Sequence, residues 1–154
     1  MEKEIITLLF ERDLKKLREE IEKYPTEESL WVQLPGTINT GGNLCQHLIG
    51  NLSTYVGLTL GNVPYVRNRD AEFARRLFTK TELIGELDKL LPVVVKSVSD
   101  LSDTQLASGY PRNVLDMFEN QTTALVLIHL LTHLSYHLGQ INYHRRWITA
   151  VNPE

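Results

Sequence analysis

The sequence predicts an all-α protein, a four-helix bundle that residues 1–154 form as a single domain. Three observations predict this fold class. Hydrophobic residues recur at helical spacing in four separate segments of roughly 20–30 residues. No segment shows the sustained alternation of apolar and polar residues that is typical of a β-strand. The chain length of 154 residues suits one domain with one hydrophobic core.

The first helix is predicted over residues 2–23 and is closed by Pro25. Its apolar positions, separated by Lys and Glu, are Ile5, Ile6, Leu9, Leu14, Leu17 and Ile21. The following stretch, TEESLWVQLPG, is predicted to be a short connector in which Trp31 serves as a packing anchor.

The second helix is predicted over residues 39–60, entered at Asn39 or Thr40 and ended at Gly61. It contains Gly42, Gly50 and Gly57. Because each glycine costs helix propensity, their presence predicts close packing of another segment against this helix. Residues 61–78 form a long, charged connection.

The third helix is predicted to begin in a capping box at Thr79 or Thr81 and to run to about residue 100, with Pro92 kinking it or marking its middle. Residues 102–118 connect to the fourth helix and could hold a short strand pair, although they lack clear alternation. The fourth helix is predicted over residues 120–149. The long connections before the second and fourth helices allow a topology other than simple up-down.

The composition excludes several classes of protein. The hydrophobic content of 42% and the charged content of 23% are ordinary for a globular protein. A net charge of −3 offers no basic surface for nucleic acid, and no polybasic run suggests an anionic membrane. No apolar stretch reaches the roughly 18–20 residues that span a bilayer, and the acidic N-terminus lacks the basic region of a signal peptide. We therefore expect a soluble cytoplasmic protein that binds neither nucleic acid nor membrane.

Four of the five histidines lie between residues 129 and 144, in the fourth predicted helix. His133 and His137 are four residues apart, so they share a face and lie about 6 Å apart along the axis. Both can therefore bind one metal ion, as the two histidines of an HExxH zinc motif do, but the segment HLSYH lacks the glutamate of the zinc proteases. His129 and His144 lie too far along the helix to join them, and we assign these two structural or surface roles.

A metal site needs a further ligand from a second helix, and His47 is the remaining histidine. A bundle that brings His47 against His133 and His137 would supply three nitrogens and leave coordination positions for water or substrate, the arrangement of a catalytic zinc site. The spacing leaves a second interpretation open, because a histidine among apolar residues is usually a core residue that is hydrogen-bonded to the backbone.

These residues resemble a known superfamily. The segment HLSYHLGQI, residues 133–141, is similar to the HxxxHxGQ signature in the last helix of the DinB-like (YfiT-like) metalloenzymes, and His47 falls where that superfamily places its first metal histidine. The stretch YVRNRDAEF, residues 65–73, resembles an uncharacterised branch that carries an RNRDAEF-like segment. The resemblance implies a four-helix bundle in which His47, His133 and His137 hold a divalent metal ion, zinc or nickel first and manganese or iron next. It also implies small-molecule substrates, since relatives include transferases that use low-molecular-weight thiols, and a homodimer.

Three accessory residues lie near the predicted ligands in the sequence: Gly139, Gln140 and Cys45. Gly139 is interpreted either as a place where another helix approaches or as a tolerated packing glycine. Gln140 is expected to bond a ligand or, preferably, a neighbouring helix. Cys45, the single cysteine, should point away from His47, about 200° around the helix, so we exclude it as nucleophile or ligand, and no disulfide within the chain is available.

Two further groups of polar residues are a charged cluster at residues 67–72 and three tyrosines. The cluster of Arg67, Arg69, Asp70 and Glu72 is predicted to be a solvated or salt-bridged structural loop rather than an anion site at a cavity mouth. Three tyrosines are candidate acids that nothing in the sequence ranks: Tyr55, Tyr136 and Tyr143.

The sequence thus supports two functions of different classes. In the first, the protein is a metal-dependent enzyme, a thiol-dependent S-transferase or a metal-hydroxide hydrolase, in which the ion lowers the pKa of a bound thiol or water. In the second, the ion only fixes two helices of a binding or stress-response bundle. The catalytic residues themselves stay unassigned.

Overall fold

The computed structural model describes residues 2–116 and 118–151. The elements in chain order are α1 (Glu2–Glu22), the 3₁₀ helix η1 (Glu28–Trp31), α2 (Gly41–Leu52), the π-helical η2 (Ser53–Leu58), α3 (Arg69–Ala74), α4 (Lys80–Ser99), α5 (Asp103–Ala107) and α6 (Thr123–Val151). Within the described residues the only β-structure is an isolated bridge between Gly109 and Thr122. The all-α prediction is confirmed, and the strand pair considered for residues 102–118 is absent from the part of that connection that is described.

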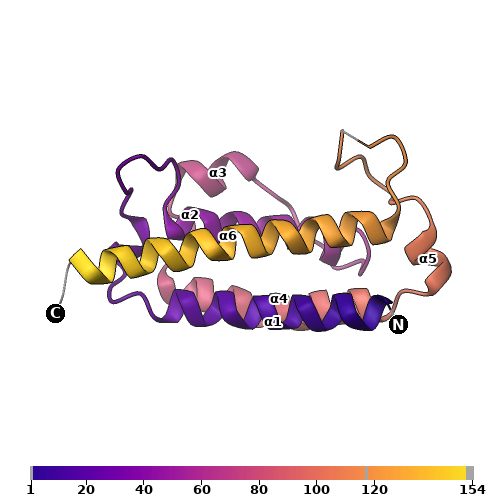
Figure 1. The fold of residues 1–154 in the computed structure, drawn as a ribbon, viewed down its shortest axis with the longest axis horizontal. Coiled ribbons are helices and arrows are strands. Elements are labelled where there is room, and N and C mark those ends of the chain that lie inside the picture. The colour runs from indigo at the N-terminus through magenta and orange to yellow at the C-terminus, as the bar shows by residue number, and fades with distance from the viewer. Residues whose placement is uncertain (1, 117, 152–154) are drawn as a thin grey trace.

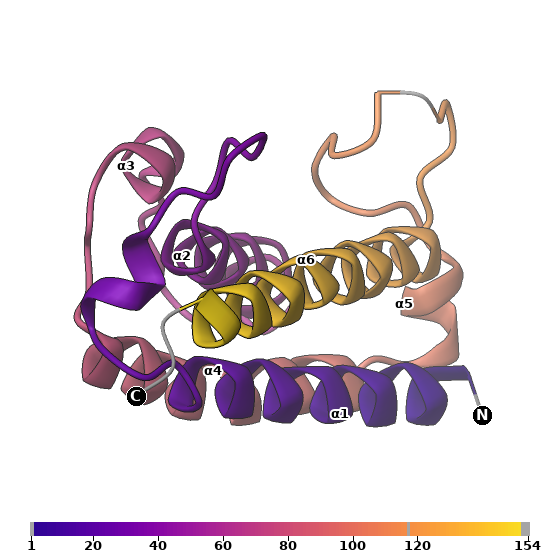
Figure 2. The same ribbon diagram turned by 60° about the vertical axis from the view of Figure 1, so that its left-hand side comes forward.

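The four long helices form two layers. Figures 1 and 2 show α1 and α4 side by side below α2 and α6, and the packing contacts join α1 to α4 and α2 to α6. The backbone N–H of Lys80 donates to Glu27 beyond the end of α1, and Lys3 donates to the carbonyl of Leu101 beyond α4, so α1 and α4 are antiparallel. The result is a four-helix bundle.

The connection between α2 and α4 is a crossover rather than a hairpin. The chain leaves η2 at one end of the bundle and returns along its outside to begin α4 at the other end, so α2 and α4 run in the same direction (Figure 1). The short helix α3 lies on this crossover and packs on the outer side of α2. The long connection before the third predicted helix therefore places residues 69–74 against α2.

The core-facing stripe of α1 follows a helical repeat. Buried side chains occupy positions three or four apart, which is the spacing of one face of a helix: Ile6, Phe10, Leu14, Leu17 and Ile21. Of the apolar residues that predicted this helix, Ile5 lies outside the stripe with 53% of its surface exposed.

The helix starts follow the polar residues that the sequence offers. Thr40 accepts from the backbone N–H of Asn43 and caps α2, while Thr79 and Glu82 form a reciprocal capping box at the start of α4. Pro92 lies within α4. The predicted second helix is divided, because α2 gives way at Ser53 to the π-helical η2. No helix in the described residues is long and apolar enough to cross a bilayer.

Candidate metal-binding site

The structure brings His47, His133 and His137 together between α2 and α6. The Nε2 atom of His133 lies 3.2 Å from Nε2 of His47 and 3.1 Å from Nε2 of His137. One ring nitrogen from each histidine lies within 4.8 Å of the other two. His47 is buried and the other two are half-buried, so the group lies where the α2–α6 seam reaches solvent.

The opposed directions of α2 and α6 explain this convergence. Near its start, α2 is close enough to α6 that a Cβ on Gly41 would lie 3.1 Å from Nδ1 of His144. Six residues further along α2 is His47, and moving back along α6 from His144 reaches His137 and then His133. Since the i, i+4 pair on α6 presents both rings on one face, a single histidine on α2 meets both.

His47 is held by a buried ion pair that comes from the crossover. Its Nδ1 lies 3.1 Å from Oε2 of Glu72, and Arg67 donates to both carboxylate oxygens of Glu72, at 2.7 and 2.9 Å. Nδ1 of His47 also lies 3.2 Å from Nη2 of Arg67, which can only donate, but that nitrogen makes its shorter bond, 2.9 Å, to Glu72. Because an ionised carboxylate only accepts hydrogen bonds, we assign a proton to Nδ1 of His47, which donates it to Glu72. The lone pair of His47 is thereby directed from Nε2 toward His133 and His137.

Burial of the Glu72 carboxyl and the hydrogen bonds that it accepts shift its pKa in opposite directions. Burial favours the neutral acid and raises its pKa, whereas the hydrogen bonds from His47 and Arg67 stabilise the anion. The second effect is the larger one, and the pKa of Glu72 lies below its usual value. Glu72 is therefore an anion at neutral pH and a permanent acceptor for His47.

Gly50 makes room for this carboxylate. It lies three residues beyond His47 on the same side of α2, and a Cβ there would lie 2.0 Å from Oε1 of Glu72 and 3.2 Å from Nε of Arg67. The glycines of the second predicted helix indicated a close approach, and at this position the approaching group is a partner of the site.

The two histidines of α6 differ in their outer nitrogens. Nδ1 of His137 lies 2.6 Å from Oε1 of Gln140, so we assign the proton to Nδ1, and Nε2 faces His133 at 3.1 Å, as Nε2 of His47 does at 3.2 Å. Gln140 thus bonds a predicted ligand on its own helix, and the preferred interpretation of a bond to a neighbouring helix is wrong. Nδ1 of His133 is buried and has no hydrogen-bond partner in the described residues.

The surroundings keep the two α6 histidines neutral. Burial, followed by the charges of His137 and His47, lowers the pKa of His133 to about 3. Burial also lowers the pKa of His137, against the opposing effect of its bond to Gln140. At neutral pH both imidazoles are therefore uncharged and carry a lone pair that a cation can accept.

The residues present fit a divalent metal ion. Two nitrogens bound at 2.0–2.1 Å with a tetrahedral angle lie about 3.4 Å apart, close to the 3.1 and 3.2 Å that separate Nε2 of His133 from its two neighbours. Three imidazoles with one carboxylate in an outer position are also the donor set typical of a catalytic site for zinc or a similar ion.

The remaining histidines lie outside this group. His144 is buried, with Nδ1 2.7 Å from the hydroxyl of Tyr24 and Nε2 2.7 Å from the carbonyl of Val32. His129 is half-buried and its ring stacks on that of His133 at a centroid distance of 6.3 Å. Both placements are consistent with the structural or surface roles that the spacing favoured.

Other predicted residues are placed as follows. Cys45 is fully buried in the core, where burial raises the pKa of its thiol. Gly139 is exposed, and nothing lies within 4 Å of a Cβ placed there, so the approach of another helix of this chain is excluded. Of the three candidate tyrosines, Tyr136 is exposed but contacts the His137 ring, Tyr55 lies beneath the guanidinium of Arg67, and Tyr143 is exposed on the next turns of α6.

The site residues that sequence reasoning did not identify are Glu72 and Arg67. The cluster at residues 67–72 was predicted to be a solvated or salt-bridged loop, and the salt bridge is present, while Arg69 and Asp70 are exposed. However, the Glu72 side chain is only 3% exposed and is bonded to His47. The signal that could have identified this partner was Gly50, a glycine on the same side of the helix as His47.

Comparisons with known proteins give a family and a fold. The family model named DUF1572, a protein of unknown function, matches residues 5–152. A crystal structure described as the conserved protein of a locus from Enterococcus faecalis is similar to this chain with a TM-score of 0.75 and 15% sequence identity, over 96% of each chain. At that identity the likeness shows a shared fold alone. No curated protein matches the sequence.

Proposed function

The chain belongs to the DUF1572 family of proteins of unknown function, and from that premise and the geometry of the histidines we propose that it is a divalent-metal-dependent enzyme of the DinB-like superfamily. The observation that carries the proposal is the convergence of one ring nitrogen from each of three histidines, two of which have a hydrogen-bond partner at the outer nitrogen. Zinc and nickel are the first candidates for the ion, because imidazole suits both, and manganese and iron come next.

In this proposal, one set of residues binds the ion and a second set orients those ligands. His47, His133 and His137 hold the ion. Glu72, itself held by Arg67, fixes the tautomer of His47 and supplies a negative charge beside a site that has three uncharged ligands. Gln140 fixes the tautomer of His137.

The proposed reaction class follows from this donor set. When bound, the ion supplies Lewis acidity that lowers the pKa of a thiol or a water molecule, so a nucleophile becomes available at neutral pH. Thiol transfer to an electrophile, or hydrolysis, fits an ion held by nitrogen ligands better than redox chemistry does. No side chain of the described residues is assigned as the catalytic acid or base.

The alternative is a metal-stabilised bundle without catalysis, in which the ion only joins α2 to α6. Metal analysis of untagged protein, followed by assays with zinc, nickel or manganese, low-molecular-weight thiols and a panel of electrophiles, separates the two. Turnover that needs the metal and is lost in His137→Ala supports the enzyme. A metal that raises only the melting temperature, with no turnover on any acceptor, supports the bundle.

The oligomeric state stays a prediction. A single chain does not test the homodimer that the resemblance implies. Light scattering at micromolar concentration measures it directly, and a monomeric mass would contradict it.

A further inference from the structure

A cavity of about 810 Å³ lies in the same seam between α2 and α6, one turn from the histidine group, and is closed on one side by residues 34–39. Its walls are mainly apolar and include Leu34, Ile38, Leu44 and Trp147. The volume falls within the roughly 300–1,000 Å³ of small-molecule sites, which are apolar with a few placed polar groups. We call it the α2–α6 pocket.

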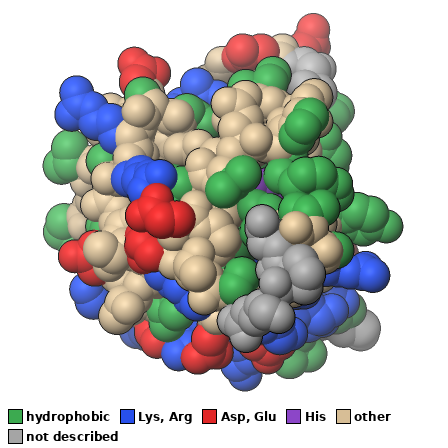
Figure 3. Space-filling model, turned by 90° about the vertical axis from the view of Figure 1, so that its left-hand side faces the viewer, with side chains coloured by type: hydrophobic (Ala, Val, Ile, Leu, Met, Phe, Trp, Pro, Cys, Tyr) green, Lys and Arg blue, Asp and Glu red, His purple; other side chains and the backbone are tan. Residues whose placement is uncertain are grey.

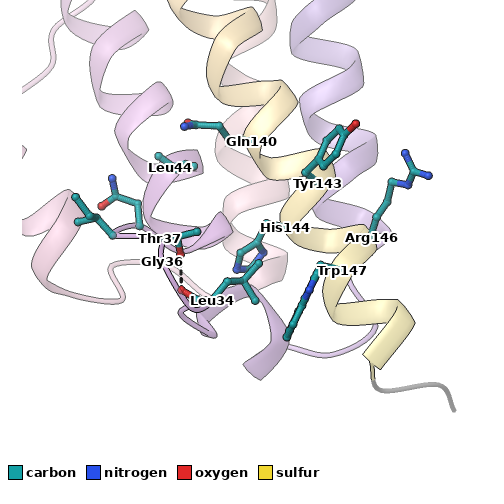
Figure 4. Close-up of a pocket in the computed structure, with 11 residues that line it drawn as sticks. Leu34, Gly36, Thr37, Leu44, Gln140, Tyr143, His144, Arg146 and Trp147 are labelled. Atoms are coloured by element: carbon teal, nitrogen blue, oxygen red, sulfur yellow. Dashed lines mark hydrogen bonds between the residues drawn. The ribbon is translucent and has the colours of Figure 1, made fainter.

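His144 lines the pocket, but neither of its ring nitrogens is available to a ligand. Both nitrogens of His144 are bonded, one to the hydroxyl of Tyr24 and the other to the carbonyl of Val32. Burial lowers the pKa of His144, so the ring is neutral at neutral pH. Figure 4 shows this ring between Leu34 and α6, with Trp147 further along the helix.

The mouth of the pocket is held by a tight turn. The backbone N–H and the hydroxyl of Thr37 donate to the carbonyl of Leu34, and Gly36 has φ +76°, which is the geometry of a type II turn with proline before glycine. This turn is followed by Ile38, which is 87% exposed, and Trp147, across the groove, is 47% exposed. Figure 3, which views this end of the molecule, shows hydrophobic side chains gathered around a hollow in which a small area of histidine is visible.

The pocket does not direct a formal charge at a ligand. Among the residues that the structure describes, the lining includes no acid or lysine, and the guanidinium of its arginine, Arg146, lies 5.9 Å from the centre of the Tyr143 ring. In Figure 4 the Arg146 side chain points away from the Leu34–Thr37 turn. A ligand that fills the pocket is therefore uncharged over the part that the pocket encloses.

The pocket and the histidine group share a residue. Gln140 lines the pocket, extends from α6 toward α2 beside Leu44 in Figure 4, and bonds Nδ1 of His137. Leu44 precedes His47 by three residues and Gln140 follows His137 by three, a rise of about 4.5 Å on each helix. The three histidines do not line the pocket, so a ligand reaches them only if its end passes beyond Leu44 and Gln140.

We infer that the α2–α6 pocket binds the uncharged, apolar body of a small-molecule substrate and directs its reactive end along the seam to His47, His133 and His137. That the bound molecule is a substrate rests on the proposed function. The binding of apolar molecules by the pocket does not, and it can be measured without any metal. The apolar lining favours a ligand whose enclosed part is an uncharged alkyl or aryl group.

The first experiment measures binding to metal-free, full-length protein. N-phenyl-1-naphthylamine, a neutral fluorescent probe, should bind with one-to-one saturation and be displaced by alkylbenzenes, whose affinity should rise about fourfold for each added methylene. Ile38→Asp and Trp147→Ala should each weaken probe binding at least about tenfold. Ile128→Asp is the matched control, since Ile128 is also exposed but lies outside the pocket, and it should bind the probe as the unaltered protein does.

Two results of this experiment would overturn the inference. One is binding that does not saturate or that is equal in Ile38→Asp and Ile128→Asp. The other is a dimer that Ile38→Asp converts to a monomer while no probe binds, because the apolar walls would then serve a second copy of the chain.

The second experiment connects the pocket to the histidines. A series of phenylalkyl hydroxamic acids, each with a neutral apolar body and a metal-binding end, should bind zinc-loaded protein at least about tenfold tighter than metal-free protein at one preferred linker length. Both Ile38→Asp and His133→Ala should remove that gain. If the increase in affinity on zinc loading does not depend on linker length or on Ile38, the inference is overturned. The metal site of the proposed function would still be supported in that case by a separate measurement of zinc binding.

Discussion

The histidines along the seam between α2 and α6 form two groups that differ in where their nitrogens find partners. In one, both nitrogens of His144 bond protein atoms, the Tyr24 hydroxyl and the Val32 carbonyl. In the other, His47, His133 and His137 turn one nitrogen each toward a common centre, and the protein supplies partners mainly for the outer nitrogens. Burial lowers the pKa of His144 just as it lowers that of His137, so burial does not distinguish the two groups.

This difference indicates which property distinguishes a candidate metal ligand from a structural histidine. A histidine whose two nitrogens are both satisfied by the protein is complete, and binding a cation would cost it a hydrogen bond. A histidine that is bonded only at its outer nitrogen has a lone pair fixed in direction and free to bind. The comparison therefore marks His47, His133 and His137 as candidate metal ligands and His144 as a structural residue, and each of these two expectations can be tested separately.

The largest expected effect is on metal affinity. His133→Ala removes the central nitrogen of the group and should reduce zinc or nickel affinity by more than about 100-fold, the upper end of what loss of an outer partner costs. His144→Ala should leave the affinity and the stoichiometry unchanged. Competition titration with a chromophoric chelator measures both. Equal losses in the two variants would remove the distinction between the groups.

The reverse effect is expected on the stability of metal-free protein. His144→Ala leaves the Val32 carbonyl without its partner and opens a cavity beside Tyr24, so it should lower the free energy of unfolding by roughly 2–4 kcal/mol. His129→Ala, on the same helix but only half-buried, should lower it by less than about 1 kcal/mol. Urea denaturation followed by circular dichroism tests this. A loss as large in His129→Ala as in His144→Ala would show that His144 has no special structural role.

The next effect concerns the outer partner of His47. Glu72→Ala frees the His47 ring and removes a negative charge beside the site, so metal affinity should fall about 10- to 100-fold. Glu72→Gln keeps an acceptor for Nδ1 and should recover part of that loss. The matched control is Glu28→Ala, because Glu28 forms an exposed ion pair with Arg76 away from the site. Unchanged affinity in a folded Glu72→Ala protein would reduce the Glu72–Arg67 pair to a purely structural feature.

Much of the fold follows from local patterns in the sequence. The first helix, the capping box at Thr79 and the last helix were predicted within a few residues of their observed bounds, because apolar spacing and capping act over neighbouring residues. The short helix α3 and the change from α2 to the π-helical η2 were not predicted. Neither has a periodic pattern long enough to be recognised.

The candidate site divides in the same way. The pairing of His133 with His137 follows from one helical turn, and the position of His47 was suggested by the helix count and the family resemblance. The partner Glu72 lies 25 residues beyond His47 and reaches it only because the crossover returns along the outside of α2. Sequence spacing carries no information about that return path, and the space left by Gly50 was its one local trace.

The smallest expected effect is the pH dependence that His144 gives to stability. Burial holds the pKa of folded His144 below the value of about 6.5 that it has in the unfolded chain. As the pH falls below about 6.5, the unfolded state takes up a proton that the folded state resists, so stability is lost on acidification and is fully present above that pH. The loss can reach about 1.4 kcal/mol per pH unit for one proton. Unfolding free energies of metal-free protein at pH 5.5 and 7.5 should therefore differ less in His144→Gln than in the unaltered protein. Because His133 and His137 are present in both proteins, subtracting the two differences isolates His144, and an equal pH dependence in both would show that its bonds to Tyr24 and Val32 survive protonation without cost.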